Sequence, residues 1–121
     1  MIVVETYVSS SKINGLGLFA NQHIKRHEIV AIWNDQFDRV FERDIFDSLP
    51  TITQQYIIKH GAIKSDGRYK LGMDGDQYIN HSDIPNLTSC EKSGGLIARD
   101  IISPHDELTC NYIDVDATGV I

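Results

Sequence analysis

Long apolar stretches are missing from this chain. The first residues, MIVVETYVSSSK, are apolar for only a few positions and already carry Glu5. A secretory signal needs a longer apolar centre, and a membrane-spanning helix needs about 20 apolar residues. We therefore expect a soluble, intracellular protein with no membrane association. No run of basic residues marks nuclear import, so the sequence does not separate cytoplasm from nucleus.

Cysteine is also scarce. The chain has two, Cys90 and Cys110, with no C-x-x-C pair. This spacing argues against a disulfide framework or a zinc knuckle and indicates a reducing compartment. His23 and His27 are four residues apart, but Glu28 is misplaced for an H-E-x-x-H zinc site and no third ligand is evident. We expect no metal.

Positive charge is in deficit. The chain has 11 Lys and Arg against 17 Asp and Glu, for a formal net charge of −6. This balance argues against direct nucleic-acid binding and suits a cationic partner such as a Lys/Arg-rich peptide. Hydrophobic residues make up 41% and charged residues 23%, as in ordinary globular proteins. At 121 residues there is room for a single packed core, so we expect one domain over residues 1–121.

The middle of the chain contains the helical signals. Phe37, Phe41 and Ile45 recur every four residues and predict a helix over residues 34–50, which Pro50 ends. The following segment, residues 51–64, is ambiguous: its first half suits a helical turn, whereas YIIKHGAI is rich in strand-forming residues.

Short strands are predicted along the rest of the chain. β-Branched and aromatic residues bounded by Gly, Ser and Pro indicate them. The expected strands or strand pairs lie at residues 2–10, 28–33, 67–75, 86–101 and 103–113, and a short tail follows. Many short strands with one or two helices predict a mainly β domain of α+β class.

The segment GLGLFA, from Gly15 to Ala20, matches the G-x-G-x-x-G/A pattern of dinucleotide-binding proteins. In that motif the first Gly directly follows a strand, whereas SSSKIN intervenes here. The crossover helix would have only about ten residues, and no second βαβ unit follows. We therefore exclude a Rossmann site, and a Gly-supported turn without a ligand is the simplest alternative.

Asn80, His81 and Ser82 form a polar triplet within QYINHSDIPNLT. A serine or cysteine nucleophile paired with a histidine is one interpretation. Adjacent residues on an extended chain point in opposite directions, and no G-x-S-x-G elbow is present, so we exclude it. Asn, Ser, Asp and Pro are turn formers as well, and taken alone the segment suits a plain turn equally well.

Three segments together resemble the SET domain, the fold of protein lysine methyltransferases. They are NGLGLFA, YINHSDIPN and DELTCNY, which occur in the family's order and approximate spacing, so that the resemblance covers residues 12–112. It implies several small β-sheets, a C-terminal pseudoknot, one or two short helices and a variable helical insert at about residues 37–58.

The resemblance implies S-adenosylmethionine as the cofactor. The backbone at Gly15, Leu16 and Gly17 would contact its methionine part, because a chain without a Cβ atom can approach a ligand closely. Asn80 would hydrogen-bond to the same part, and the backbone of His81 would meet the adenine edge. The polar triplet would then be a cofactor bed.

Tyr112 matches the catalytic tyrosine of the family. The implied reaction moves a methyl group directly to the neutral side-chain amine of a lysine, in a histone or another basic protein. Only about one lysine in a thousand is neutral at pH 7, and burial in a narrow apolar channel raises that fraction by lowering the pKa. Tyr56, Tyr69 and Tyr78 are the candidates for lining this channel, and the peptide would lie beside the insert as an added strand.

Several features depart from the family pattern, among them Asp83 in place of the family's usual Cys. Gln77 replaces the usual Arg, and no cysteine-rich segment follows Tyr112. The chain thus resembles the minimal stand-alone SET proteins of viruses and bacteria, some of which complete their site with a second subunit, so a homodimer is a further expectation. The departures favour an alternative, a catalytically degenerate SET domain that binds a peptide or protein. The intact Asn80–His81 pair and Tyr112 favour the enzyme.

Overall fold

A computed structural model describes residues 1–64, 66–90, 92 and 94–113. Within these ranges the secondary structure consists of short strands in four small sheets, with two α-helices and a 3-10 turn. The predicted mainly β, α+β class is confirmed. The elements are β1 (Thr6–Ser10), β2 (Leu16–Ala20), β3 (Ile29–Ala31), β4 (Arg39–Phe41), α1 (Arg43–Ser48), α2 (Thr51–His60), β5 (Ala62–Ile63), β6 (Tyr69–Leu71), η1 (Asp76–Tyr78), β7 (Asn80–His81), β8 (Leu87–Cys90), β9 (Gly95–Ala98) and β10 (Thr109–Cys110).

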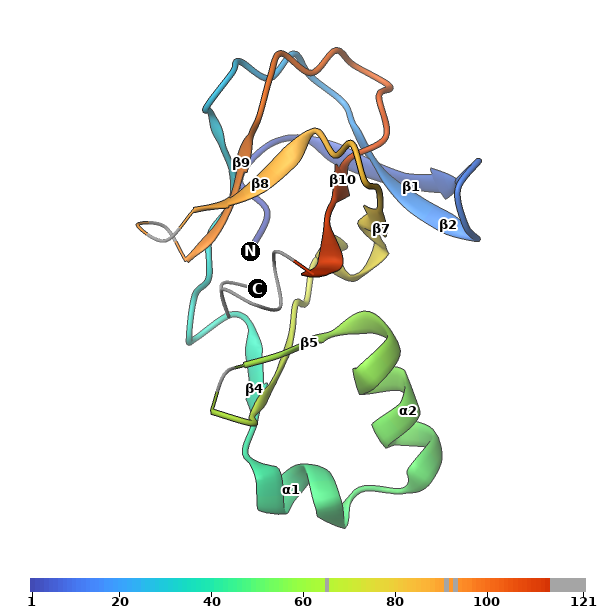
Figure 1. Cartoon of the computed structure of the whole chain (residues 1–121), viewed down its shortest axis with the longest axis vertical. Helices are drawn as coiled ribbons and strands as arrows, with labels where there is room; N and C mark the ends of the chain where they lie inside the picture. Colours follow the sequence, from blue (N-terminus) through green and yellow to red (C-terminus); the bar gives the residue numbers. More distant parts are fainter. Residues whose placement is uncertain (65, 91, 93, 114–121) are drawn as a thin grey trace.

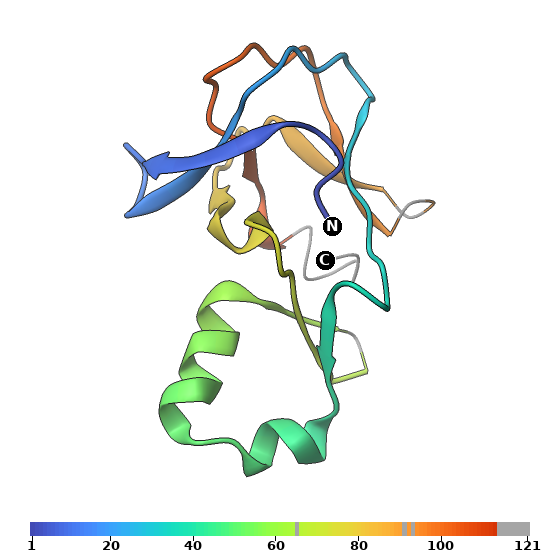
Figure 2. The same cartoon turned by 180° about the vertical axis from the view of Figure 1, so that it is seen from behind.

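The elements form two parts, which can be followed in Figure 1. The upper part holds the antiparallel β1–β2 hairpin, the β3–β9–β8 sheet and the parallel β7–β10 pair. The lower part, here called the helical part (residues 39–71), holds α1, α2 and the β4–β6–β5 sheet. Seen from behind in Figure 2, the N-terminus lies between the two parts.

The main hydrophobic core lies within the upper part. Its buried members come from the hairpin, the three-stranded sheet, the two segments that form the parallel pair and the isolated bridge between Ile24 and Ile102: Leu18, Ala20, Ile24, Val30, Ala31, Ile79, Leu87, Leu96, Ala98, Ile102, Leu108 and Cys110. The helical part has its own buried residues, Phe46 and Ile57, and Phe46 stacks on Tyr69 with ring centroids 4.1 Å apart.

The predicted helix over residues 34–50 is wrong in its first half. Residues 39–41 form β4, which pairs antiparallel with β6, and α1 begins only at Arg43. The four-residue spacing of Phe37, Phe41 and Ile45 therefore spans a turn, a strand and a helix. The short stretch Arg39–Phe41 contains residues that suit a pleated strand, and pairing with β6 outweighs the weak helical period. Pro50 does follow the end of α1, as predicted.

The ambiguous segment at residues 51–64 divides into α2 and β5. Pro50 is the N-cap of α2, and the helix continues through the residues whose β-branching suggested a strand. The Gln54 side chain helps to explain this outcome, because its Nε2 lies 3.0–3.3 Å from three carbonyl oxygens at the end of α1, those of Phe46, Asp47 and Leu49. A helix leaves its last carbonyls without internal partners, and this amide supplies donors to them.

The remaining strand predictions are largely confirmed. The expected opening strand divides into an isolated bridge between Ile2 and Ala31 and the strand β1. Residues 28–33 contain β3, residues 86–101 contain β8 and β9, and residues 103–113 contain β10. The predicted tail after residue 113 lies outside the described residues.

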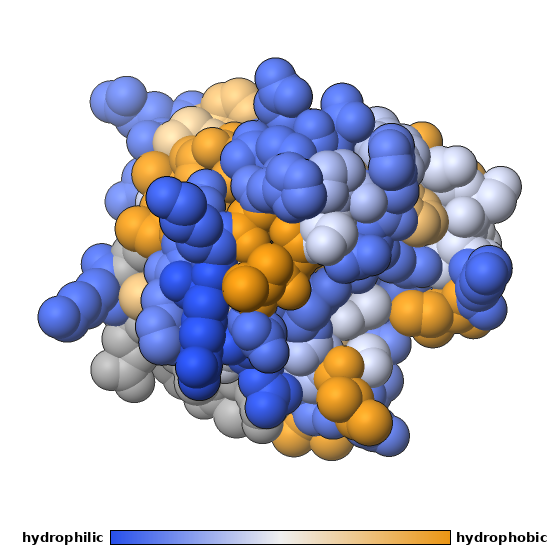
Figure 3. Space-filling model, turned by 90° about the horizontal axis from the view of Figure 1, so that it is seen from above, coloured by the Kyte–Doolittle hydropathy of each residue, from blue (hydrophilic) through white to orange (hydrophobic). Residues whose placement is uncertain are grey.

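The surface shown in Figure 3 is mixed. Hydrophobic groups on this face are separated from one another by hydrophilic residues. In the described part of the chain, no helix has the length and apolar character required to cross a membrane.

The parallel pairing of β7 with β10 brings two distant motifs together. Asn80 lies opposite Thr109, and His81 lies opposite Cys110. The Asn86 side chain holds this arrangement from the next loop: its Nδ2 donates to the Glu107 carbonyl at 2.8 Å, and its Oδ1 accepts from the Thr109 N–H at 2.9 Å. A two-residue ladder is short, so these side-chain bonds contribute a large share of its hydrogen bonding.

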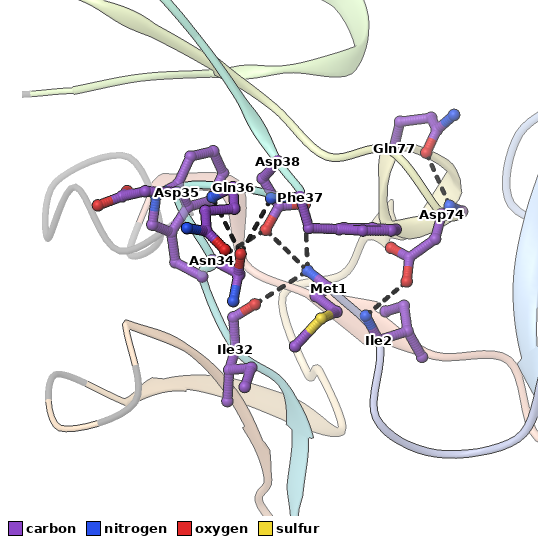
Figure 4. Close-up of polar contacts among 12 residues, drawn as sticks. Met1, Ile2, Ile32, Asn34, Asp35, Gln36, Phe37, Asp38, Asp74 and Gln77 are labelled. Carbon is purple, nitrogen blue, oxygen red and sulfur yellow. Dashed lines mark hydrogen bonds and ion pairs between the residues drawn. The ribbon is translucent and has the colours of Figure 1, made fainter.

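An acidic cluster surrounds the terminal ammonium of Met1, as Figure 4 shows. The ammonium nitrogen lies 3.0 and 3.2 Å from the two carboxylate oxygens of Asp38 and 2.9 Å from the Ile32 carbonyl. Asp74 accepts the Ile2 N–H at 2.8 Å. Asp76 lies beside them, and its buried Oδ1 has no hydrogen-bond partner in the described structure. Burial raises the pKa of Asp76 to about 6, the terminal ammonium lowers it in part, and the nearby carboxylates add to the rise.

The Asn86 contacts generate a stability prediction. Replacement Asn86→Ala leaves the Thr109 N–H and the Glu107 carbonyl without these partners, and we expect a loss of about 1–3 kcal/mol in unfolding free energy. Urea denaturation followed by tryptophan fluorescence measures it. Asn21→Ala, at an exposed position, is the control and should change stability little. Equal stability of Asn86→Ala and the parent chain would contradict the role assigned to Asn86.

Asp76 generates a pH-dependent prediction. Because its pKa in the folded chain lies above the unfolded value of 3.8, the parent chain loses stability as pH rises from about 4 to about 6. Asp76→Asn has no carboxyl group to ionise and so does not undergo that loss. The unfolding free energy of the variant should therefore exceed that of the parent chain by an amount that grows across this window and reaches roughly 1–3 kcal/mol at pH 8. Denaturation at several pH values tests this, with exposed Asp44→Asn as control. An advantage that does not change with pH would contradict the assignment.

Candidate functional site

The turn between β1 and β2 presents open backbone. The Ser11 N–H donates to the Gly15 carbonyl at 2.8 Å and closes the turn. Gly15 has a φ of +50°, a value that favours glycine, and a Cβ atom built there would meet nothing within 4 Å. The space beside this residue is therefore free for a ligand that approaches the main chain.

Gly17 meets a different requirement, because it is buried. A Cβ atom there would lie 2.5 Å from the Glu107 Oε2 and 3.2 Å from the Ser11 Cβ. Only glycine lets the Glu107 carboxylate lie against β2, where both of its oxygens accept from the Ser11 hydroxyl at 2.8 Å. The second glycine, Gly17, thus makes room for the Glu107 carboxylate, whereas the first, Gly15, leaves space for a ligand.

The Asn80 side chain joins the turn to the parallel pair. Asn80 is 7% exposed, and its Nδ2 lies near four oxygen acceptors: the Ser11 hydroxyl (3.1 Å), the Asn14 and Leu16 carbonyls (3.1 Å each) and the Glu107 carboxylate (2.9 Å). An NH2 group has two hydrogens to donate, so these acceptors share them and fix which way the amide faces. The Asn80 Oδ1 then faces away from them and makes no hydrogen bond within the described residues, which suits an acceptor for a ligand amine or amide.

His81 positions the main chain at Tyr112. Its Nδ1 accepts the Tyr112 N–H at 3.1 Å, so the ring proton belongs on Nε2, which lies 2.9 Å from Asp83 Oδ1 and donates to it. The rings of His81 and Tyr112 meet edge to face with centroids 5.4 Å apart. Asp83 therefore acts through His81 to fix the position of Tyr112.

The Tyr112 hydroxyl is directed back into the fold. It donates to the Ile79 carbonyl at 2.6 Å, one residue before Asn80. A phenol that donates its proton in this way can still accept a hydrogen bond at its oxygen. The hydroxyl is thus oriented to accept from an N–H group that enters beside it.

A cavity of about 140 Å³ adjoins Tyr112, between the upper part and the helical part. Apolar, aromatic and ionisable side chains all contribute to its wall. Its lining residues are Trp33, Ile58, Lys59, His60, Gly61, Ala62, Lys70, Gly72, Asp76, Gln77, Ile79, Leu96, Cys110 and Tyr112.

The three tyrosines predicted for a lysine channel lie around this cavity but not in its wall. Tyr69 stacks on Phe46 in the helical part. Tyr56 and Tyr78 each contact the ring of His60, at centroid distances of 4.6 and 6.1 Å, and His60 itself lines the cavity. The channel assignment of these tyrosines therefore stays a prediction, with His60 as the residue that connects two of them to the cavity.

Sequence reasoning missed Trp33 and Lys70 as cavity residues. The Lys70 Nζ lies 4.7 Å from the centroid of the Trp33 ring, and Lys70 is only 6% exposed. Its burial lowers the pKa of its amine, and the charges of Lys64 and Arg68 lower it further. Trp33 is the single tryptophan and ends a predicted strand, which was a usable signal. For Lys70 no such signal exists. Side chains alternate between the two faces of a strand, but the sequence of Tyr69–Leu71 does not show which face is buried.

A group of carboxylates is close enough to hold a metal ion. One oxygen from each of Asp38, Asp74 and Asp76 lies within 4.8 Å of the others. Asp38 already binds the Met1 ammonium, and one oxygen of Asp74 accepts from Ile2. The buried Asp74 Oδ1 and Asp76 Oδ1 have no hydrogen-bond partner within the described residues. The sequence indicated no metal ligand, and Asp76 of this group also lines the cavity beside Tyr112.

Comparison with known proteins gives a family and several structural relatives. A family model of the SET domain matches residues 15–113. A search of curated protein sequences finds no match. Among solved structures, a candidate histone methyltransferase from Plasmodium falciparum is similar at a TM-score of 0.62 and 22% identity, over 89% of this chain and 96% of that one.

Two structures of Polycomb Repressive Complex 2 are also similar. The humanized Chaetomium thermophilum complex bound to the inhibitor GSK126 has a TM-score of 0.68 at 18% identity, over 91% of this chain and 15% of that one. An apo form of the complex has a TM-score of 0.72 at 18% identity, with the same coverage. At these identities the likeness establishes the fold, and this chain spans a small fraction of the Polycomb subunit.

The family match covers most of the chain, and the glycine turn, the Asn80 amide and Tyr112 converge at one place in the fold. The chain belongs to the SET-domain family, which includes lysine methyltransferases.

Proposed function

We propose that this chain is an S-adenosylmethionine-dependent protein lysine methyltransferase. The observation that carries the proposal is a convergence: the open turn at Gly15, the Asn80 amide and the Tyr112 hydroxyl come from distant segments and meet along the β7–β10 pair. The same hydroxyl lies at the wall of a cavity. A peptide-binding module has no need for this combination of ligand-accessible backbone and an oriented phenol.

The residues present fit the proposed cofactor. The open main chain at Gly15 and Leu16 and the Oδ1 of Asn80 would hold its amino acid part, and the backbone of His81 would meet its adenine. When bound, S-adenosylmethionine supplies an electrophilic methyl group on a positively charged sulfur. The hydrogen bonds from Asn80 to the turn hold both the main chain of the turn and the Asn80 side chain in place, so little reorganisation is needed when the cofactor binds.

Tyr112 and the cavity act on the substrate amine. The Tyr112 oxygen accepts a hydrogen bond from the entering N–H and so orients the nitrogen lone pair. The apolar side chains of Ile79 and Leu96 line the same cavity and disfavour the charged ammonium form, which lowers the pKa of an entering lysine. Both effects increase the fraction of amine that is neutral and aligned for attack.

A Lys/Arg-rich peptide is the proposed substrate. The net charge of −6 attracts a cationic segment, and Glu42, Asp44 and Asp47 are exposed at α1. β5 is an edge strand of its sheet, and Ala62 of this strand lines the cavity. A peptide that adds to this edge would deliver a lysine side chain next to Tyr112.

Calorimetric titration with S-adenosylmethionine and S-adenosylhomocysteine, followed by assay of methyl transfer to lysine-rich peptides, tests the proposal. Binding of about one ligand per chain together with methylated peptide supports it. Peptide binding without cofactor binding would favour a degenerate binding module instead. A series of chain concentrations tests the expected homodimer in the same experiment, because a shared site loses affinity on dilution.

Tyr112→Phe should reduce methyl transfer by roughly 100-fold or more, because the phenol that orients the amine is lost. Affinity for S-adenosylhomocysteine should stay near that of the parent chain, since the ring contact with His81 is kept. Tyr7→Phe is the matched control, because Tyr7 stacks on Phe19 in the β1–β2 hairpin and does not line the cavity. Unchanged turnover in Tyr112→Phe would remove this hydroxyl from the mechanism.

Asn80→Ala should weaken cofactor binding by about 1–3 kcal/mol, because it removes the Oδ1 acceptor and releases the turn. Ser82→Ala is the matched control within the same triplet, since among the described residues the Ser82 hydroxyl accepts one local N–H, that of Ile84. Calorimetry with S-adenosylhomocysteine compares the two variants. Equal affinities would contradict the cofactor-bed interpretation of the triplet.

A further inference from the structure

Three aspartates from separate segments bring their carboxylates together beside the N-terminus. Asp38 directly precedes β4, Asp74 lies in the loop after β6, and Asp76 is the first residue of η1. Figure 4 shows Asp38 and Asp74 next to the first two residues of the chain. One carboxylate oxygen from each aspartate lies within 4.8 Å of the other two. Asp38 is 6% exposed, Asp76 is 9% exposed and Asp74 is half-buried, so these carboxylates are not a solvated acidic surface.

Two oxygens of this cluster lack partners. Among the described residues, the buried side-chain nitrogen and oxygen atoms without a hydrogen bond are Asp74 Oδ1 and Asp76 Oδ1, and both belong to the cluster. Folded proteins leave few buried polar atoms unpaired, and a buried carboxylate oxygen without a partner is costly. The Asp76 carboxylate is also packed against the main chain, because a Cβ atom at Gly72 would overlap both of its oxygens.

The charges of the cluster are only partly balanced. The Met1 ammonium donates to both carboxylate oxygens of Asp38 and to the Ile32 carbonyl. The charged groups with the largest influence on Asp76 are this ammonium, Asp74 and Asp38. Three carboxylates and one ammonium leave two negative charges, which one divalent cation neutralises. A water molecule could hydrogen-bond to the unpaired oxygens, but it would leave both charges in place.

The ligand atoms select the class of cation. The cluster offers carboxylate oxygens and contains no histidine or cysteine, a set that suits hard cations such as Ca²⁺ and Mg²⁺ rather than softer transition metals. Calcium binds oxygens at about 2.3–2.6 Å, so two ligands of one ion lie at most roughly 5 Å apart. The spacing of the three carboxylates therefore lets a single ion reach all of them.

We propose that Asp38, Asp74 and Asp76 form a binding site for one hard divalent cation. Asp74 Oδ1 and Asp76 Oδ1 are its principal ligands, and Asp38 shares its carboxylate between the ion and the Met1 ammonium. The ion joins the segment before β4 to the segment that leads from β6 into η1. The expectation of no metal rested on cysteine and histidine spacing, which does not report on a site built from aspartates. This site does not depend on the proposed methyl transfer.

Calorimetric titration of the metal-free chain with Ca²⁺ and, separately, Mg²⁺ tests the proposal. At pH 8 the Asp76 carboxyl, with its pKa of about 6, is ionised. We expect about one ion per chain, and a loss of affinity of roughly 10-fold or more in Asp74→Asn and Asp76→Asn. Exposed Asp44→Asn is the control and should bind as the parent chain does. No saturable binding of either cation, or equal affinity of Asp76→Asn and the parent, would overturn the proposal.

Thermal unfolding provides a second test, in which loss of fold cannot imitate loss of the site. Asp76→Asn removes a buried charge and is expected to fold. An ion that binds only the folded chain raises its unfolding midpoint, so the cation that binds should raise the midpoint of the parent chain relative to chelator. The same addition should change the midpoint of Asp76→Asn little. Equal shifts in the two chains would contradict a site at Asp76.

Terbium luminescence locates the ion. Tb³⁺ is a hard cation that replaces Ca²⁺ in oxygen sites, and its emission can be excited through Trp33, the single tryptophan, which lines the same cavity as Asp76. We expect emission that the competing divalent cation abolishes and that Asp76→Asn loses. Asp35→Asn is the matched control, because Asp35 accepts the Trp33 Nε1–H at 2.6 Å but lies outside the cluster. Emission lost in Asp35→Asn and kept in Asp76→Asn would place the ion elsewhere and reject the site.

Discussion

The buried amide of Asn80 is the contact on which the site depends. Its nitrogen lies within 3.1 Å of oxygens from the β1–β2 turn and from Glu107, so a single side chain joins the hairpin to the C-terminal strand. An amide at 7% exposure is costly unless its hydrogen bonds are made, and these acceptors satisfy its donors. Gly17 is part of the same arrangement, because a Cβ atom there would displace the Glu107 carboxylate.

A chain of contacts connects Asn80 to Tyr112. Asn80 opens β7, β7 pairs in parallel with β10, and β10 ends two residues before Tyr112. His81 then accepts the Tyr112 N–H, and the Tyr112 hydroxyl returns to the carbonyl of Ile79. Tyr112 is thus fixed at both its main-chain N–H and its hydroxyl group. These two contacts hold its phenol in place within a fold of short strands.

The cavity beside Tyr112 has a different character from the ligand-accessible turn. It combines apolar residues with two groups whose ionisation is unfavourable there, since burial lowers the pKa of Lys70 and raises the pKa of Asp76 to about 6. Perturbed ionisable groups of this kind concentrate at functional sites, because the packing that encloses a substrate also excludes water from the protein's own side chains.

The sequence by itself determined the family, the mainly β class and the residues that meet along β7 and β10. Those features depend on short contiguous motifs, whose residue types and spacing are visible in one dimension. The helix predicted over residues 34–50 was wrong in its first half because β4 pairs with β6, a contact between segments about 30 residues apart that a local hydrophobic period does not detect. The same limit applies to the cavity, where Trp33, His60 and Lys70 come from three separate segments of the chain and share no motif. Only the tertiary structure decided that Lys70 faces inward, because alternation along a strand distinguishes two faces but packing chooses which of them is buried.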